Sequence, residues 1–200
     1  MSSDGLSAGA RRHLLAMARR AIEDQLSGEL RPEDELGELR LELERRCGAF
    51  VTLTRRGDGE LRGCVGVPEP LYRLDQAVAR AAVAAAVYDR RFDPVASSEL
   101  PGLSLHVSVL GDLRPIEPDV VEVGVHGLVI RCDGRSGLLL PQVAAERGWD
   151  RERFLDETCR KAGLPPETWR RPDCELLAFT ATVFSDEEKI ARVDGQGRWR

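Results

Sequence analysis

The chain has 200 residues, of which 42% are apolar and 32% are charged, and its formal net charge is −5. A chain of this length and balance folds as one globular domain or two closely joined lobes, without needing disulfides or metals, and is neither a disordered nor a membrane protein. No apolar run reaches the ~18 residues of a membrane helix, and the N-terminus lacks the apolar centre of a signal peptide. The acidic balance, with arginines interleaved among acids, argues against a nucleic-acid binder.

Five cysteines are spread widely along the chain, and no CxxC pair occurs among them. A structural zinc site normally shows close pairs, so neither zinc nor any other metal is expected. The odd number and wide spacing also argue against a disulfide framework. Free thiols are typical of a reducing compartment, so the sequence predicts a cytoplasmic protein. The cysteines are Cys47, Cys64, Cys132, Cys159 and Cys174.

The first predicted element is an amphipathic helix, because apolar residues recur every four positions from Leu14 to Leu26. Ser27 and Gly28 end it, and an acidic stretch of loop with some helix follows. Residues 49–54 then have the β-branched and aromatic character of a strand. After a turn at residues 57–59, residues 61–66 form the returning strand of a hairpin.

The clearest helix is predicted over residues 71–88, where a run of alanines gives high helix propensity. Its thin alanine surface would also let a sheet approach closely. Residues 103–109 alternate apolar and polar side chains, as in a half-buried strand. A loop separates the two elements.

The second half is expected to begin with a short strand at residues 128–130 and a turn at 133–137. Pro141 suits the first turn of one helix, and Asp150 suits the N-cap of another. A long last strand covers residues 174–184, and the polar tail after Ile190 is expected to fray. The predicted class is α/β (α+β), with a mixed, largely antiparallel sheet and flanking helices.

Cys64 is the best candidate functional atom, because it stands between Gly63 and Gly66 in the hairpin. Glycines let a ligand or another backbone come close to a strand. Arg62 could then favour the thiolate, which is the reactive form of cysteine. The structural alternative is a small buried thiol in a tight hairpin.

His126 enters a predicted strand beside Gly127, and its imidazole could serve as acid or base for a thiol. The alternative is a histidine tied to a backbone carbonyl. His106 points away from the apolar face of its strand, toward solvent or a second layer.

Two charged segments allow both a structural and a functional interpretation. Residues 133–137 offer backbone N–H groups and the Arg135 guanidinium, which can hold an anion, although the turn pattern favours a plain glycine-rich hairpin. Residues 89–93 follow the alanine-rich helix, where arginines complement the helix dipole or form a charged rim around a cleft.

Several stretches in the same order resemble the AMMECR family, also called AmmeMemoRadiSam system protein A. Residues 61–66 (LRGCVG) look like its LRGC[IV]G signature, and residues 89–95 (DRRFDPV) resemble its DPRFxPV segment. Residues 105–110 resemble a family strand that contains Ser108. Residues 126–143 resemble a block that ends LLLPQV and contains Gln142. The resemblance covers a core of about residues 14–185 within a single domain of residues 1–200, with residues 186–200 as a tail.

The resemblance implies a two-lobed α/β fold with a cleft between the lobes. It also implies association with two other proteins: a Memo-type protein, related to extradiol dioxygenases, and a radical S-adenosylmethionine enzyme. The chain departs from the family at Arg90, where the family often has proline, and at Asp93, where proline is common. These differences leave any role of Asp89 open.

The sequence allows three hypotheses about the function of the chain. The first is an enzyme without a cofactor, acting on a small anionic substrate. The second is a non-catalytic module that holds a ligand or a partner's tail. An RNA-associated factor is disfavoured by charge. In the enzyme, the catalytic residues would be Cys64 and His126, and the substrate-binding residues would be Arg62, Gly63, Gly66, Ser108, Arg135 and Gln142.

Overall fold

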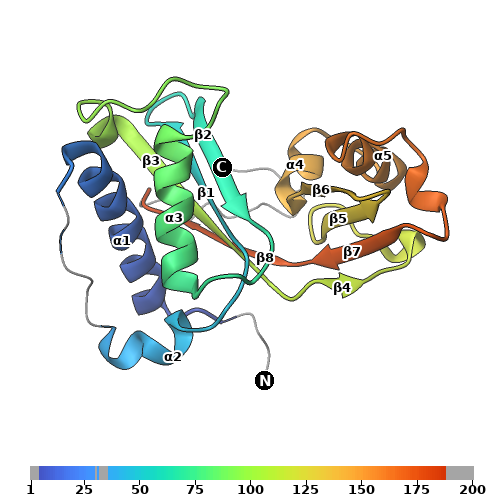
Figure 1. Ribbon diagram of the computed structural model, residues 1–200, viewed down its shortest axis with the longest axis horizontal. Helices are drawn as coiled ribbons and strands as arrows, with labels where there is room; N and C mark the ends of the chain where they lie inside the picture. Colours follow the sequence, from blue (N-terminus) through green and yellow to red (C-terminus); the bar gives the residue numbers. More distant parts are fainter. Residues whose placement is uncertain (1–4, 30, 32–35, 188–200) are drawn as a thin grey trace. The chain divides into compact units, whose positions relative to one another are not determined.

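The structure is a computed structural model that describes residues 5–29, 31 and 36–187. Figure 1 shows its helices and strands. The chain forms two compact units: the first runs to Leu110 and takes back the chain from Thr182, and the second spans Gly111–Ala181. Two units agree with the predicted lobes, and the predicted cleft between them stays a prediction.

The first unit is built on a four-stranded sheet with the order β2-β1-β3-β8. Helices α1 and α3 supply buried side chains to the same core as these strands (Figure 1). The strands are β1 (Ala49–Arg55), β2 (Leu61–Val67), β3 (Leu103–Leu110) and β8 (Ala181–Ser185), and the helices are α1 (Ala8–Ser27), α2 (Arg40–Leu43), α3 (Leu74–Val87), η1 (Gly37–Leu39) and η2 (Leu100–Gly102).

Both predicted helices of this unit form for the expected reasons. The Ser7 hydroxyl accepts a hydrogen bond from the amide of Ala10 and caps α1, and Gly28 ends the helix with a φ of 73°. The alanine-rich α3 buries Ala81, Ala82 and Ala85. Short side chains on that face bring the helix axis close to the sheet.

The register of β1 decides which side chains share a face. Val51 and Leu53 are buried in the core under the helices, so the alternate residues Thr52 and Thr54 point to the opposite face. The pairings of β1 with β2 and with β3 are both antiparallel. A shift in register between Leu53 and Thr54 leaves Arg62 of β2 without a partner on β1, as in a β-bulge.

The second unit has its own sheet, with the order β4-β7-β5-β6. Helix α5 begins after Asp150, whose carboxylate accepts a hydrogen bond from the amide of Arg153, as its sequence predicts. Phe154 and Leu155 of α5 pack on Leu128 of the sheet. The elements are β4 (Arg114–Pro115), β5 (Gly127–Cys132), β6 (Arg135–Leu139), β7 (Glu175–Phe179), α4 (Pro141–Glu146), α5 (Arg151–Lys161), η3 (Pro118–Val120) and η4 (Thr168–Arg170).

Three details differ from the sequence analysis. The single sheet is two sheets, one in each unit. The predicted turn at residues 133–137 shrinks to Asp133 and Gly134, both with positive φ, and the next residues form β6. The predicted last strand is two strands, β7 and β8, which belong to different sheets, because Thr180 interrupts the run and its carbonyl accepts from the amide of Gly111 (2.8 Å).

Within the described residues, no helix is long and apolar enough to cross a membrane. The predicted fraying of the tail falls on positions 188–200, which lie outside the described residues.

Candidate functional site

Cys64 lies in the middle of β2, at the edge of the first sheet. It stands directly opposite Thr52 of β1, so both side chains point to the sheet face opposite α1 and α3. The cysteine is a free thiol and is half-buried. Its sulfur therefore lies outside the helix-facing core, on the polar face of the sheet.

The space beside both neighbouring glycines, which the sequence analysis reserves for a ligand, is filled by the protein itself. A Cβ on Gly63 would overlap the backbone carbonyl of Ala85 in α3. A Cβ on Gly66 would overlap Ala49 and Phe50 of β1. Gly63 thus lets the helix approach the sheet, and Gly66 lets β1 and its phenylalanine do so.

The backbone of Cys64 is held by a carboxylate and a guanidinium. Its N–H donates to Oδ2 of Asp89 (2.9 Å), and its carbonyl accepts from Nη2 of Arg91 (3.2 Å). Because β2 is an edge strand, no other strand among the described residues pairs with these two groups. Asp89 and Arg91 therefore take the place of that strand and join two segments that are 25 residues apart in the chain.

Asp89 and Arg91 also form an ion pair, with Nη2 of Arg91 2.7 Å from Oδ2 of Asp89. The hydrogen bond from Arg91 holds the pKa of the Asp89 carboxyl well below its usual range, and the amides of Cys64 and Arg91 act in the same direction against burial, which raises it. Asp89 is therefore ionised at neutral pH and accepts from Cys64 throughout the physiological range. The family resemblance left the role of Asp89 open, and in the structure Asp89 positions the backbone of Cys64.

Arg62 is buried, with 7% of its surface exposed, and its guanidinium is used within the fold. It pairs with the carboxylate of Glu99 (3.1 Å) and donates to the carbonyls of Asp93 (2.9 Å) and Pro94 (3.5 Å). These contacts tie β2 to the loop after α3. The arginine that contacts Cys64 is Arg91, whose Nη2 donates to the Cys64 carbonyl (3.2 Å).

A row of three side chains crosses the polar face of the sheet. Cys64 of β2, Thr52 of β1 and His106 of β3 are directly opposite one another in the two antiparallel pairings. The Thr52 hydroxyl donates to the sulfur of Cys64 (3.1 Å). His106 stands two strands from Cys64, on the order of 10 Å by strand spacing, so it does not bond the sulfur directly.

His106 bonds Thr54 instead, with 3.0 Å between Nε2 and the hydroxyl oxygen. Burial lowers the pKa of His106, against the carboxylates of Glu187 and Asp186, which raise it. His106 is thus neutral at physiological pH. The sequence correctly predicted that His106 points away from the apolar face of its strand. It could not predict whether the side chain is exposed to solvent or buried.

We predict that His106 makes the first unit lose stability in mild acid. Its folded pKa lies below the unfolded value of about 6.5, so the unfolded chain binds the proton first as the pH falls through that value. The contribution is fully present above about pH 6.5 and is lost below it. Urea unfolding at pH 7.5 and 5.5 should show a larger loss for the natural chain than for His106→Gln; equal losses would contradict the assignment.

The other predicted residues are placed as follows. Ser108 lies on β3 opposite Phe50 and is 3% exposed. His126 belongs to the second unit, where its Nδ1 accepts from the amide of Glu122 (3.0 Å) and closes a local turn. Arg135, on β6, donates to the carbonyl of Gly163. Gln142 lies half-buried in α4. The functional roles predicted for all four stay predictions.

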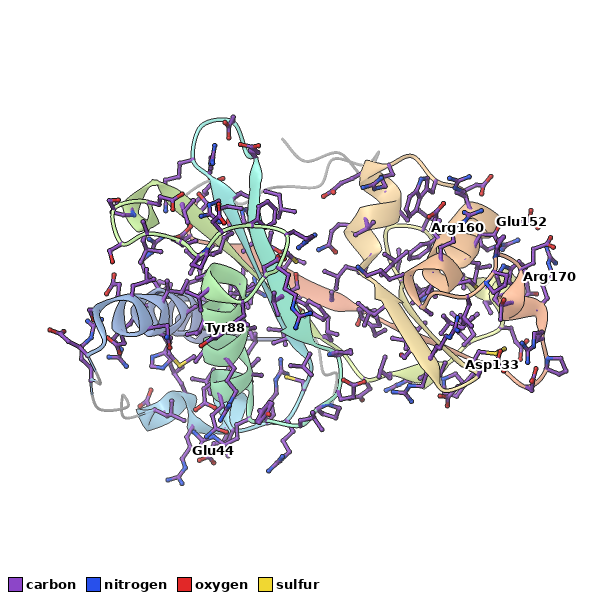
Figure 2. The ribbon with its side chains drawn as sticks, turned by 45° about the horizontal axis from the view of Figure 1, so that its top comes forward. Glu44, Tyr88, Asp133, Glu152, Arg160 and Arg170 are labelled. Atoms are coloured by element: carbon purple, nitrogen blue, oxygen red, sulfur yellow. A yellow bond between two sulfur atoms is a disulfide. The ribbon has the colours of Figure 1, made fainter. Side chains whose placement is uncertain are left out.

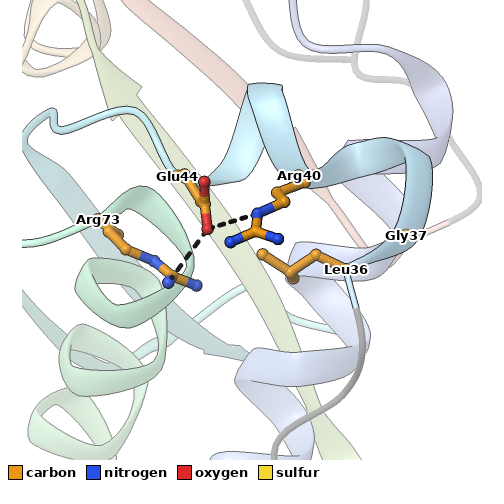
Figure 3. A pocket seen from close by; sticks show the side chains of 5 residues that line it. All are labelled: Leu36, Gly37, Arg40, Glu44 and Arg73. Atoms are coloured by element: carbon orange, nitrogen blue, oxygen red, sulfur yellow. Dashed lines mark hydrogen bonds and ion pairs between the residues drawn. The ribbon is translucent and has the colours of Figure 1, made fainter.

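One described pocket of about 370 Å³ lies elsewhere in the first unit. Figure 3 shows Glu44 between the guanidinium groups of Arg40 (2.9 Å) and Arg73 (3.5 Å), with Leu36 and Gly37 beside them. Because Glu44 neutralises part of the arginine charge, this hollow has no strong preference for an anion. None of its lining residues belongs to the row that contains Cys64.

The prediction that all five cysteines are free is wrong, because Cys132 and Cys174 form a disulfide. Cys64 is a free, half-buried thiol, and Cys159 is a free, buried one. The two bonded residues are 42 positions apart, and only the antiparallel pairing of β5 with β7 brings them together. The expectation of a cytoplasmic protein relied on free thiols, so this pair removes part of its basis.

The chain is therefore an α/β protein of two units, each with its own antiparallel sheet and helices, and it carries a half-buried thiol on an edge strand. Comparison with known proteins identifies it: the AMMECR1 family model matches residues 15–184, so the chain belongs to the AMMECR1 family. This confirms the resemblance noted in its sequence.

The relatives include a protein of Methanopyrus kandleri, 44% identical over 183 residues that cover 88% of this chain and 87% of the relative. A protein of Thermococcus gammatolerans is 46% identical over 186 residues, covering 87% and 89% of the two chains. The crystal structure of an uncharacterised protein from Pyrococcus horikoshii is similar with a TM-score of 0.80 and 44% identity, covering 88% and 90%. These names state no reaction, so function is argued from the site.

Proposed function

We propose that this protein is a cysteine-dependent enzyme in which Cys64 forms a transient covalent bond with a small anionic substrate. The observation that carries the proposal is the hydrogen bond from the Thr52 hydroxyl to the sulfur of Cys64 (3.1 Å). A donor aimed at sulfur stabilises the thiolate, which is the nucleophilic form of cysteine.

The geometry around Cys64 supports a fixed nucleophile. Asp89 and Arg91 hold its N–H and carbonyl, so the backbone at this edge is tied although no strand lies beside it. Fixed geometry lowers the entropic cost of reaching an attacking position. Arg91 is 55% exposed and adds positive charge near the sulfur, although Asp89 offsets much of it.

Thr52→Val is the direct test of the donor. Valine keeps the shape and removes the hydroxyl, and a hydrogen bond to a charged group contributes about 1.5 kcal/mol, or roughly a factor of ten. We expect the alkylation of Cys64 by iodoacetamide at neutral pH, followed by mass spectrometry of the peptide, to slow by about tenfold.

Thr54→Val is the matched control, because Thr54 has the same strand and face but bonds His106. Its effect on Cys64 should be less than twofold. If the two variants slow alkylation equally, or if neither does, the hydroxyl does not activate the sulfur.

A non-catalytic ligand- or partner-binding module is the second candidate. It is favoured by Arg62, whose guanidinium is taken up by Glu99 and by backbone carbonyls and so does not reach for a substrate. Cys64→Ser separates the two functions: an enzyme loses its cellular activity with this change, and a module keeps it.

The association with a Memo-type protein and a radical S-adenosylmethionine enzyme, which the family resemblance implies, is part of the same proposal. Either function would place the chain beside these partners. In Cys64→Ser, unaltered association with lost cellular activity would favour the enzyme, and unaltered association with retained activity would favour the module.

A further inference from the structure

The second unit carries a pair of cysteines at the end of a strand ladder. Cys132 is the last residue of β5, and Cys174 immediately precedes β7. The ladder ends with Arg131 opposite Glu175, so the cysteines are the next pair in register. Their Cα atoms are 4.6 Å apart, the spacing of a non-hydrogen-bonded antiparallel pair. The strands therefore keep the two sulfurs adjacent whether or not they are bonded.

Asp173 adds a carboxylate to this pair. The two sulfurs and a carboxylate oxygen of Asp173 all lie within 4.8 Å of one another. In a tetrahedral site with Zn–S distances of about 2.3 Å and Zn–O distances of about 2.0–2.2 Å, ligand atoms stand roughly 3.5–3.8 Å apart. After reduction the two sulfurs, which are bonded in this structure, turn apart, and a rotation of the Asp173 side chain, which is 62% exposed, brings its carboxylate to them.

The carboxylate of Asp173 is paired with Arg171, which donates to Oδ1 (3.0 Å) and to Oδ2 (2.6 Å). Arg171 bridges two carboxylates, with Nη1 2.9 Å from Oδ2 of Asp133 and Nη2 2.6 Å from Oδ2 of Asp173; Asp133 is labelled in Figure 2. Arg171 can keep Asp133 when Asp173 turns to a metal, and exposed ion pairs of this kind contribute little to stability.

We propose that the reduced Cys132–Cys174 pair forms, with Asp173, a binding site for a soft divalent metal of the zinc type. The disulfide takes two electrons from a dithiol, which becomes a disulfide in turn, and yields two thiols. Metal binding then releases their two protons. Soft thiolate ligands select zinc over magnesium or calcium, and three protein ligands leave a fourth position for water or another donor.

The burial of the three ligands gives the site an open side. Cys132 is 5% exposed, Cys174 is half-buried and Asp173 is exposed. An ion would enter from the side of Asp173 and meet the buried sulfur last. The disulfide and the metal exclude each other, so redox state decides which form exists.

The test is a cobalt titration of the full chain, reduced with a phosphine and studied without oxygen. We expect one Co²⁺ per chain and a thiolate-to-cobalt charge-transfer band in the near ultraviolet, which the oxidised chain lacks. Cys132→Ser and Cys174→Ser should each remove the band. Asp173→Asn should weaken binding by at least about tenfold, the lower end of what loss of even an outer partner of a metal site causes.

Controls separate this site from other thiols and acids. Cys64→Ser and Cys47→Ser should leave the band unchanged, and Asp133→Asn should alter the dissociation constant by less than twofold. Circular dichroism checks the folding of each variant, and the half-buried Cys174 provides a variant if buried Cys132 does not tolerate serine. No charge-transfer band in the reduced chain, or a band that survives Cys174→Ser, would overturn the proposal.

Discussion

Replacement of Gly63 by alanine is expected to destabilise the first unit by about 3 kcal/mol, the upper part of the range for added core volume. The new methyl group would overlap the backbone carbonyl of Ala85, and a backbone atom cannot rotate away as a side chain does. Helix α3 or strand β2 would have to shift, and with it the neighbouring Cys64. Hydrogen exchange of the β1 and β2 amides, measured with urea unfolding, checks the loss.

Gly102→Ala is the matched control, because nothing lies within 4 Å of a Cβ built at Gly102 and its φ is not positive. This change should stay within about 0.5 kcal/mol, as is usual for surface substitutions. A loss of similar size in both variants would mean that close helix approach is not what Gly63 provides.

Removal of the Cys132–Cys174 disulfide is expected to destabilise the second unit by about 4 kcal/mol. The bond closes a loop between residues 42 positions apart, and the chain-entropy estimate for such a loop gives ~4 kcal/mol. The double variant Cys132→Ala/Cys174→Ala should therefore lose protection of the β5 and β7 amides in hydrogen exchange, while the β1 and β3 amides stay as they are.

The natural chain under reducing conditions is the control, and it should match the double variant to within about 1 kcal/mol when no metal is present. Equal stability of the oxidised chain and the variant would contradict a constraining role for the bond.

The sequence predicted those elements whose signals are local. The amphipathic period of α1, the alanines of α3 and the Asp150 cap of α5 all act within a few residues, and each helix forms near its expected bounds. The run at residues 174–184 shows the limit. It is apolar throughout, and nothing local indicates that its halves join different sheets.

For the candidate site as well, local features could be predicted from the sequence and long-range contacts could not. Cys64 could be singled out from its signature, and alternation correctly placed His106 away from the apolar face. The contacts of Cys64 could not be predicted. Thr52 lies beside it because of the strand register, and Asp89 and Arg91 lie beside it because the segment after α3 packs along β2. Glycines beside a cysteine suggested space for a ligand, whereas the fold uses that space for α3 and for Phe50.

The disulfide between Cys132 and Cys174 shows why the spacing of the cysteines in the sequence led to the wrong prediction that all of them are free. The disulfide depends on β5 lying next to β7, a long-range pairing that the sequence does not encode in any short motif. A rule based on close cysteine pairs therefore could not detect it.

The central claim is that the fold activates the sulfur of Cys64, and its alkylation rate tests this most directly. In a Cys47→Ser/Cys159→Ser background, Cys64 should react with iodoacetamide at pH 7 about tenfold faster than a cysteine in an unstructured peptide, since a hydrogen bond to a charged group contributes about 1.5 kcal/mol, or roughly a factor of ten. A rate at or below that of the peptide, in a chain shown to be folded, would contradict the account.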